Sequence, residues 1–358
     1  MSGIGMGLGA SVDLSRGVNQ RDLSATALLS QHLFWLTEIR YRIAPELRHR
    51  VGGAADRPRL EVYGRLRELP RLAFFGLGPG SPNTEFTFGE REALLGTAAS
   101  WPLSGWLRAF GSLEYRRPVL EGGGDPHAIE HFFTDQMVPG LAAQPDFLRY
   151  DLGTELRWPA QPPYGTDATV GYSIFQDLNG GRSSFGQLRA AAMRTQAFTS
   201  VTPSDTASHG SIVQRIFCAS GTVRSCDYGA FTARARTVLS TAFPRSAVPF
   251  YYQPTLGGTD IDGFDTLRGF TDYRFRAPSF WLGQAEYSRH AWGPIKWMLF
   301  YDVGKVSPNI AHLNFVQVRQ DWGPGATLVL LSHELLRAYA GFGGGEGVEL
   351  ALKLSQAF

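Results

Sequence analysis

The chain has 358 residues, including 42 glycines and 21 prolines, and its formal net charge is +2. Aromatic residues make up 13% of the sequence and charged residues only 18%. This composition is too apolar for a disordered chain, has no collagen period and lacks the residue bias of a helical protein. Near-neutral charge also gives no support for nucleic-acid binding. Composition therefore favours an aromatic-rich β protein with many turns.

Apolar and polar side chains alternate along most of the sequence, which is the period of a β-strand. In chain order, the pattern predicts strands at 3–14, 22–31, 33–43, 59–70, 85–99, 105–117, 147–158, 167–178, 186–200, 229–243, 279–291, 296–306, 323–331, 334–342 and 348–358. The segment 249–256, or one ahead of Met1, would supply a sixteenth strand. Bacterial single-chain barrels have an even strand number, so we expect about 16.

Strand length separates a soluble sandwich from a membrane barrel. Segments such as 105–117 and 147–158 are longer than the roughly 5–6 residues common in soluble domains, and they reach the roughly 9–11 that a membrane strand needs. No run of 18 apolar residues predicts a transmembrane helix. We therefore expect an all-β fold, a transmembrane antiparallel β-barrel that forms a single domain over 1–358, in a bacterial outer membrane.

Long connections separate several of these strands. They are rich in glycine and proline, and they lie at 118–146, 201–228, 244–278 and 307–322. Such segments are interpreted as loops or plugs of the barrel.

Four short motifs stand in order along the chain. They are Phe74-Phe75-Gly76-Leu77-Gly78-Pro79-Gly80-Ser81, Leu267-Arg268-Gly269-Phe270, Ala285-Glu286-Tyr287 and Phe300-Tyr301-Asp302-Val303-Gly304. Together they resemble the barrel domain of the Omp85 superfamily, the BamA-like and TamA-like surface antigen D15 group, with its FxGxGPxS turn, its (V/L)-R-G-(F/Y) loop tetrapeptide, its A-E-Y strand and its F-x-D-x-G strand. The resemblance covers most of the chain.

The resemblance implies that loop 244–278 folds inward and that Arg268 anchors it inside the barrel. Glu286 and Asp302 fall on the polar face of their strands, so both are expected to point into the lumen. A guanidinium there would form strong, possibly bidentate, hydrogen bonds with these carboxylates, and Gly269 would permit a tight backbone turn. In the alternative, Arg268 lies on an exposed loop and the carboxylates merely line water.

The last strand carries a second expectation. Leu350, Leu352, Leu354 and the terminal Phe358 share one face and look like the signal that the outer-membrane assembly machinery reads. An apolar strand edge is a template for strand addition, which gives this recognition a physical basis. The simpler interpretation is a closing strand that faces lipid, and both can hold.

The resemblance implies a non-enzymatic protein without a cofactor. Members of the family help to insert other barrels or move polypeptides across the membrane, by opening the seam between first and last strands so that a client strand can pair there. Expected partners are outer-membrane lipids or lipopolysaccharide, the assembly machinery and unfolded client polypeptides. The family's POTRA modules precede the barrel, and no residues ahead of Ile4 would form one here.

A passive pore or structural barrel is the alternative function. Its lumen would carry arginines that bias conductance. These are Arg65, Arg67, Arg108, Arg149, Arg157, Arg234 and Arg236.

Two further signals remain. Cys218 and Cys226 lie in one loop and fit a small disulfide, two free thiols or half of a metal site, of which the disulfide is favoured in an oxidising compartment. His127, Glu130 and His131 match a metalloprotease pattern, but they lie in an expected loop, without the helix that this chemistry requires. No metal site is therefore predicted.

Overall fold

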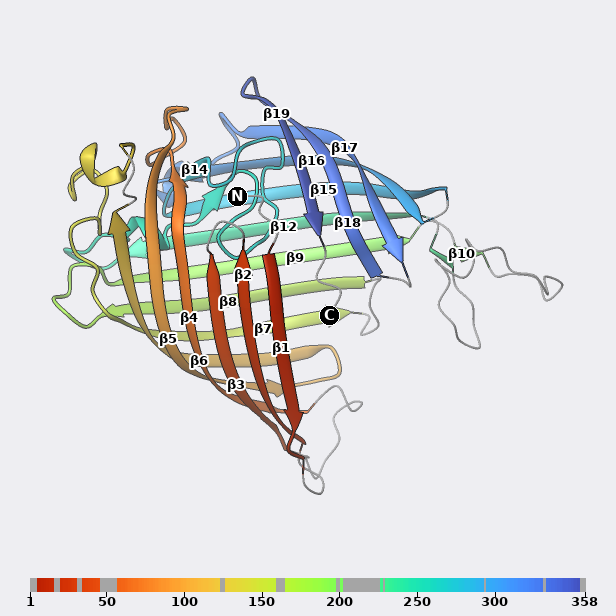
Figure 1. Ribbon diagram of the computed structural model, residues 1–358, viewed down its shortest axis with the longest axis horizontal. Coiled ribbons are helices and arrows are strands. Elements are labelled where there is room, and N and C mark those ends of the chain that lie inside the picture. The colour runs from red at the N-terminus through yellow and green to blue at the C-terminus, as the bar shows by residue number, and fades with distance from the viewer. Residues whose placement is uncertain are drawn as a thin grey trace.

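The computed structural model describes residues 5–15, 20–30, 34–45, 57–122, 126–158, 165–197, 200–201, 226–227, 229–292, 294–330 and 333–354. Fifteen strands form one sheet in which each strand pairs with the next along the chain (Figure 1). They are β1 (Gly5–Asp13), β2 (Gln20–Ser30), β3 (Trp35–Ala44), β4 (Arg59–Phe74), β5 (Phe86–Pro102), β6 (Leu107–Gly122), β7 (Phe147–Trp158), β8 (Gly165–Asp177), β9 (Phe185–Ala197), β12 (Gly229–Ala242), β15 (Ser279–Trp292), β16 (Ile295–Ser307), β17 (Arg319–Leu330), β18 (His333–Gly343) and β19 (Gly347–Leu354).

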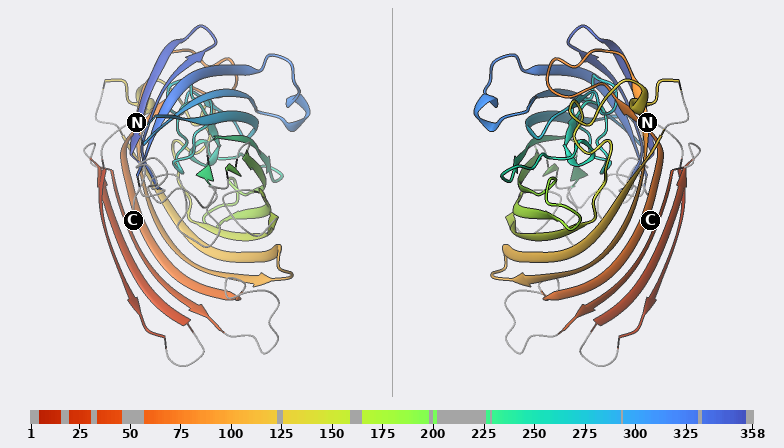
Figure 2. Two further views of the ribbon diagram at one scale, coloured as in Figure 1. Left: turned by 90° about the vertical axis from the view of Figure 1, so that its right-hand side faces the viewer. Right: turned by 90° about the vertical axis from the view of Figure 1, so that its left-hand side faces the viewer.

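All neighbouring strands of this sheet run antiparallel, and the sheet curls around the segment between β12 and β15 (Figure 2). The prediction of an antiparallel all-β barrel is confirmed. The remaining elements are β10 (Ser200–Val201), β11 (Cys226–Asp227), β13 (Thr255–Leu256), β14 (Phe275–Arg276), and the 3-10 turns η1 (Ile129–His131), η2 (Phe250–Tyr252) and η3 (Ile310–His312). No helix in the described ranges is long and apolar enough to cross a membrane.

The segment 249–256 is not a sixteenth strand of the wall, so this part of the strand prediction was wrong. It contains η2 and then β13, which pairs only with β14. Pro249 and Pro254 lack the backbone N–H that a wall strand must donate. The described sheet therefore has two edges, β1 and β19, and no backbone pairing among the described residues joins them.

The two faces of the wall differ as the alternation predicts. On β7, the outward Leu152 is 71% exposed, whereas its inward neighbour Asp151 is 8% exposed. On β19, Leu350 and Leu352 are exposed on the outside, and Lys353 turns inward to contact the loop. An apolar exterior around a polar interior is the pattern of a barrel that has lipid as its outer solvent.

The height of the apolar exterior fits a membrane. On β5, ten residues separate the outward Trp101 from the outward Arg91, and Leu95 lies exposed between them. At roughly 3.3 Å per residue and a strand tilt of about 40°, this interval rises roughly 25 Å, the usual height of a lipid-facing band.

One end of the lumen is filled by aromatic side chains, which we call the aromatic plug. The wall contributes Phe74, Phe88, Phe147, Phe175 and Phe185, and η2 contributes Phe250, Tyr251 and Tyr252. The ring of Phe250 meets Phe74 and Phe88 edge-on, with centroid distances of 5.5 and 5.0 Å. The plug thus joins the loop between β12 and β15 to the N-terminal half of the wall.

Leu152→Arg tests the orientation of the wall. A cation in the lipid-facing band should lower the free energy of unfolding by about 2–4 kcal/mol. The matched Leu178→Arg change, at an exposed position in the loop after β8, should have little effect. Urea titration of the heat-modifiable folded form in lipid vesicles measures both. Equal stability of the two variants would contradict an outward, lipid-facing Leu152.

Candidate functional site

The candidate site is the segment 243–278, which connects β12 to β15 and lies inside the barrel (Figure 2). The short β13–β14 ladder closes it into a hairpin, with Thr255 opposite Arg276. Gly257 and Gly258 both have positive φ angles, of 115° and 54°. A Cβ on Gly257 would come within 2.6 Å of the Arg274 side chain, so only glycine fits here.

Arg268 forms a bidentate ion pair with Asp302 of β16. Its Nε donates to Oδ2 and its Nη2 to Oδ1 of Asp302, both at 2.8 Å, and its backbone N–H donates to the same carboxylate at 3.2 Å. Its Nη1 donates to Oε2 of Glu286 on β15 at 2.6 Å. The structure thus brings together the arginine and the two carboxylates that the sequence analysis singled out.

These charges are almost fully withdrawn from water. Arg268 is 1% exposed and Asp302 is not exposed at all. Burial alone would lower the pKa of the Arg268 guanidinium, but its hydrogen bonds and its charge pairing with Asp302 and Glu286 outweigh burial and raise the pKa above its ordinary value. The site therefore holds a permanent cation between two acids.

The F-x-D-x-G motif of β16 faces the loop with all three of its defining residues. The guanidinium carbon of Arg268 lies 3.9 Å from the ring centroid of Phe300, a cation–π contact. Asp302 supplies the ion pair, and a Cβ on Gly304 would come 3.0 Å from the side chain of Leu256. Alternate residues of a strand share a face, so all three residues point toward the loop. Phe300 offers an aromatic ring, Asp302 offers a carboxylate, and Gly304 leaves space for a loop side chain.

Neighbouring strands complete the shell around Arg268. Glu286 accepts a second hydrogen bond from Nη2 of Arg337 on β18 at 3.2 Å. The amide of Gln284 donates to the Thr266 carbonyl at 2.8 Å and to Asp302 at 3.2 Å. Contacts from β15, β16 and β18 therefore converge on one turn of the loop.

Gly269 lets the loop approach the wall more closely than any other residue would. A Cβ there would lie 2.6 Å from the Asp321 side chain and 2.7 Å from the Gly343 backbone. On β18, a Cβ at Gly341 would come 2.5 Å from the Arg268 carbonyl. The sequence analysis missed Gly341 and Gly343, although two glycines at strand spacing are a sign of close backbone approach.

Two further ion pairs tie the loop to β18 and β19, which together we call the terminal hairpin. Lys353 of β19 contacts Asp265 and donates to the Thr259 hydroxyl at 2.7 Å. Arg274 donates twice to Glu346 in the β18–β19 turn, each time at 2.8 Å. The sequence analysis did not single out these pairs. The local sequence pattern does not show which charged residue of the loop will pair with which charged residue of the terminal hairpin.

Arg274 also connects the loop to the turn motif at 74–81. Its Nη1 donates to the Ser81 hydroxyl at 3.0 Å and its Nη2 to the Ser81 carbonyl at 3.2 Å. In addition, the Gly78 amide donates to the Arg276 carbonyl at 2.7 Å. The turn motif at 74–81 therefore packs against the part of the loop that follows Phe270, although about 190 residues separate the two segments.

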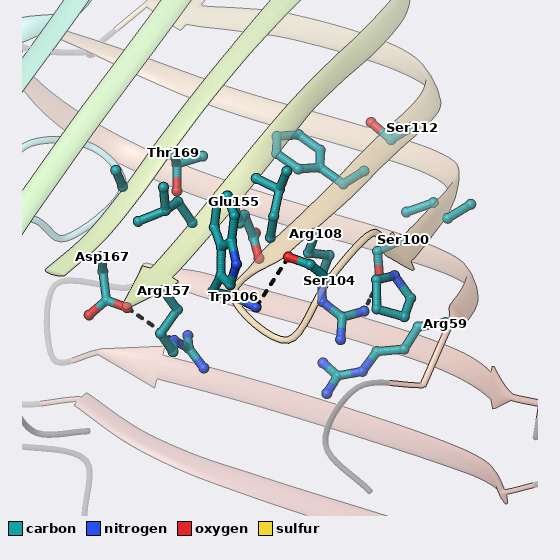
Figure 3. A pocket seen from close by; sticks show the side chains of 18 of the residues that line it. Arg59, Ser100, Ser104, Trp106, Arg108, Ser112, Glu155, Arg157, Asp167 and Thr169 are labelled. Atoms are coloured by element: carbon teal, nitrogen blue, oxygen red, sulfur yellow. Dashed lines mark hydrogen bonds and ion pairs between the residues drawn. The ribbon is translucent and has the colours of Figure 1, made fainter. Parts of the chain in front are cut away.

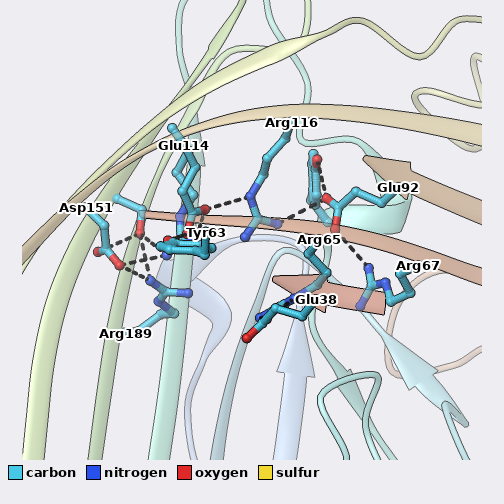
Figure 4. Close-up of polar contacts among 12 residues, drawn as sticks. Glu38, Tyr63, Arg65, Arg67, Glu92, Glu114, Arg116, Asp151 and Arg189 are labelled. Carbon is cyan, nitrogen blue, oxygen red and sulfur yellow. Dashed lines mark hydrogen bonds and ion pairs between the residues drawn. The ribbon is translucent and has the colours of Figure 1, made fainter. Parts of the chain in front are cut away.

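The rest of the inner wall carries a row of alternating charges from β3 to β9, which we call the charge ladder (Figure 4). Its ion pairs are Arg65–Glu38, Arg67–Glu90, Arg67–Glu92, Arg116–Glu92, Arg116–Glu114, Arg149–Glu114, Arg149–Asp151 and Arg189–Asp151. The Tyr252 hydroxyl of the loop donates to Glu92 at 3.2 Å, so the loop also bonds to this side of the lumen.

A polar hollow of 590 Å³ occupies the lumen at the end opposite the aromatic plug (Figure 3). Charges of both signs line it: Arg59, Glu61, Arg108, Glu155, Arg157 and Asp167. Arg59 and the plug residue Phe74 are the two ends of β4, which places the hollow and the plug at opposite ends of the barrel. The plugged lumen thus retains a charged vestibule.

Other predicted site residues are placed as follows. Leu350, Leu352 and Leu354 point outward and are exposed, whereas Phe358 lies outside the described residues. Cys218 also lies outside them, so the predicted disulfide remains a prediction, although Cys226 begins β11. The His127–His131 segment forms only the 3-10 turn η1, and the described residues contain no group of three metal-binding side chains.

Comparison with known proteins places the fold. No protein-family model and no curated protein matches the sequence. Among solved structures, the chain resembles BamA from Haemophilus ducreyi lacking POTRA domains 1–3, with a TM-score of 0.56 and 10% identity over 98% of this chain and 68% of that one. It also resembles CdiB from Escherichia coli, with a TM-score of 0.55 and 10% identity over 98% and 57%. The chain thus shares their β-barrel fold and spans little more than half of CdiB.

Arg268→Ala should leave Asp302 and Glu286 buried without their main partner, which typically costs about 3–5 kcal/mol. The matched control is Arg157→Ala, because Arg157 pairs with Asp167 at 3.0 Å but both side chains are largely exposed, at 65% and 44%. An exposed pair is worth about 0–1 kcal/mol. Protease cleavage within 243–278 and urea unfolding measure the difference. Similar losses in both variants would contradict a special role for Arg268.

Proposed function

We propose that this chain is a bacterial outer-membrane barrel of the Omp85 type, which assists the insertion of other outer-membrane proteins or the passage of polypeptides. The fold similarity to BamA and CdiB supports the barrel. The four family-like motifs support the finer assignment, because their residues meet one another around a single loop. In this proposal the chain performs no bond chemistry and needs no cofactor.

The observation that carries the proposal is the buried ion pair of Arg268 with Asp302 and Glu286. Removing an arginine from water is costly, and its ion pairs with Asp302 and Glu286 offset that cost only while the loop stays inside the barrel. A plugged barrel that must hold and reposition its loop does need such a device. Arg268 is therefore proposed to anchor the plug, a structural and gating role.

The edges of the sheet supply the proposed site of action. β1 and β19 end the described sheet, and a strand edge with free N–H and C=O groups can pair with an incoming strand. β19 is also the strand that Lys353 ties to the plug loop. We propose that this tie controls how readily the edge of β19 becomes available to a client.

The proposed partners follow from the surfaces. The outward leucines of β19 and the rest of the apolar exterior would contact membrane lipids, including lipopolysaccharide. The same leucines, together with Phe358, would serve as the signal for the chain's own assembly machinery. Unfolded outer-membrane proteins are the proposed clients.

Reconstitution tests the function. Intact protein in planar bilayers should show low conductance, and in lipid vesicles it should accelerate the folding of an added unfolded outer-membrane barrel. Arg268→Ala should raise the conductance because the plug is released. A large, steady conductance of the intact protein without accelerated client folding would support the passive-pore alternative instead.

Lys353→Met tests the tie to the last strand. Together with Asp265→Asn and the double variant, it forms a cycle in which direct contact predicts a coupling of about 0.5–3 kcal/mol. Hydrogen exchange of the β19 amides should rise in each single variant. The control is Lys305→Met, because Lys305 bonds instead to Asn314 in the exposed β16–β17 loop. Additive effects of Lys353 and Asp265 would rule out the tie.

A further inference from the structure

A second aspartate lies beside the Arg268 ion pair. Asp321 of β17 is directly opposite Asp302 of β16 in the strand register, and both side chains point into the lumen. Asp321 is 1% exposed. Directly opposite side chains on one face have Cβ atoms about 4.5–5.5 Å apart, so the two carboxyl groups are within reach of each other.

The two aspartates differ in what they bind. Asp302 accepts hydrogen bonds from Arg268 on both oxygens and another from Gln284. Neither buried oxygen of Asp321 meets a side-chain or backbone donor that satisfies hydrogen-bond geometry within the described residues. A buried carboxylate without a donor would be costly, and one beside a second carboxylate would be more costly still.

The charged groups around Asp321 do not offset the cost of burying an ionised carboxylate at this position. On β16 it faces the acid Asp302, and on the loop it faces Arg268, whose guanidinium nitrogens are already used by Asp302 and Glu286. On its own strand, Arg319 turns away to the Pro79 carbonyl at 3.0 Å. On β18, Arg337 pairs with Glu286. Gly269 of the loop lies close, since a Cβ there would come 2.6 Å from the Asp321 side chain, but neither Asp321 oxygen has a hydrogen-bond partner in the described residues.

We propose that Asp321 is a proton-binding site. Its carboxyl group keeps a proton at neutral pH and donates a hydrogen bond through that proton to the carboxylate of Asp302. The negative charge then stays on Asp302, where Arg268 binds it, and the proton bridges β16 and β17. Asp321 thereby acts as a positioning residue, which orients the carboxylate that receives the arginine. This inference deepens the proposed function by making the hold on the plug loop sensitive to protons.

The direction of the pH effect follows from proton linkage. In the unfolded chain Asp321 is an ordinary carboxyl group and is ionised at neutral pH. Folding then takes up one proton, so the contribution of Asp321 to stability is greatest at low pH and falls as the pH rises. One such proton changes the unfolding equilibrium constant tenfold per pH unit, until the folded state also loses the proton.

Infrared difference spectroscopy tests the proton directly. At pH 7, the intact folded protein minus the Asp321→Asn variant should show the carbonyl stretch of one protonated carboxylic acid. The control is Asp167→Asn, which removes a carboxylate of an exposed ion pair and should leave that band unchanged. Absence of a protonated-acid band that depends on Asp321 would overturn the proposal.

Urea unfolding from pH 6 to pH 9 tests the consequence. The wild-type unfolding constant should rise with pH by up to tenfold per unit relative to Asp321→Asn, whose amide can still donate to Asp302 but cannot ionise. Asp321→Leu, which cannot donate, should expose loop 243–278 to protease more than Asp321→Asn does. Parallel pH profiles of the wild type and Asp321→Asn would overturn the proposal. These readouts need no client, so a failure of the insertion assay would leave them intact.

Discussion

The cost of burying the Arg268 guanidinium is the constraint on which much of this barrel depends. A cation in a dry site destabilises the fold unless every donor finds an acceptor in the right place. Here Asp302 and Glu286 supply those acceptors, Phe300 supplies a ring face, and Gly269 allows the backbone to come close enough. The motif residues thus act together to stabilise one buried cation. They can do so only when strands β15 to β18 are in register.

The remainder of the lumen follows a looser form of the same rule. The charge ladder places acids and bases side by side, so that each of its charges has a partner of opposite sign. Many of these side chains are buried, among them Glu92, Glu114 and Arg149, and the vestibule at the far end has charges of both signs too. Aromatic side chains close the opposite end, where water is excluded. The interior thus changes from charged to aromatic along the barrel axis.

Much of this architecture could be predicted from the sequence. The period of two located the fifteen wall strands, because a wall between lipid and a polar lumen forces every strand to alternate. It failed at 249–256, where Pro249, Pro254 and three aromatic residues form part of the plug. The motifs identified Arg268, Asp302 and Glu286. They could not identify Asp321, because only the pairing of β16 with β17 shows that this acid lacks a donor.

The plug loop has its ionic partners and its aromatic partners on different parts of the wall. Arg268 bonds to β15 and β16, and Arg274 and Asp265 bond to the terminal hairpin, 72 and 88 residues further along the chain. The η2 aromatics instead pack on the upstream strands β4 to β9. The loop therefore crosslinks two parts of the wall that are not adjacent in the sheet, by charge on one side and by ring packing on the other. Losing either set of contacts would leave the loop attached to the other part.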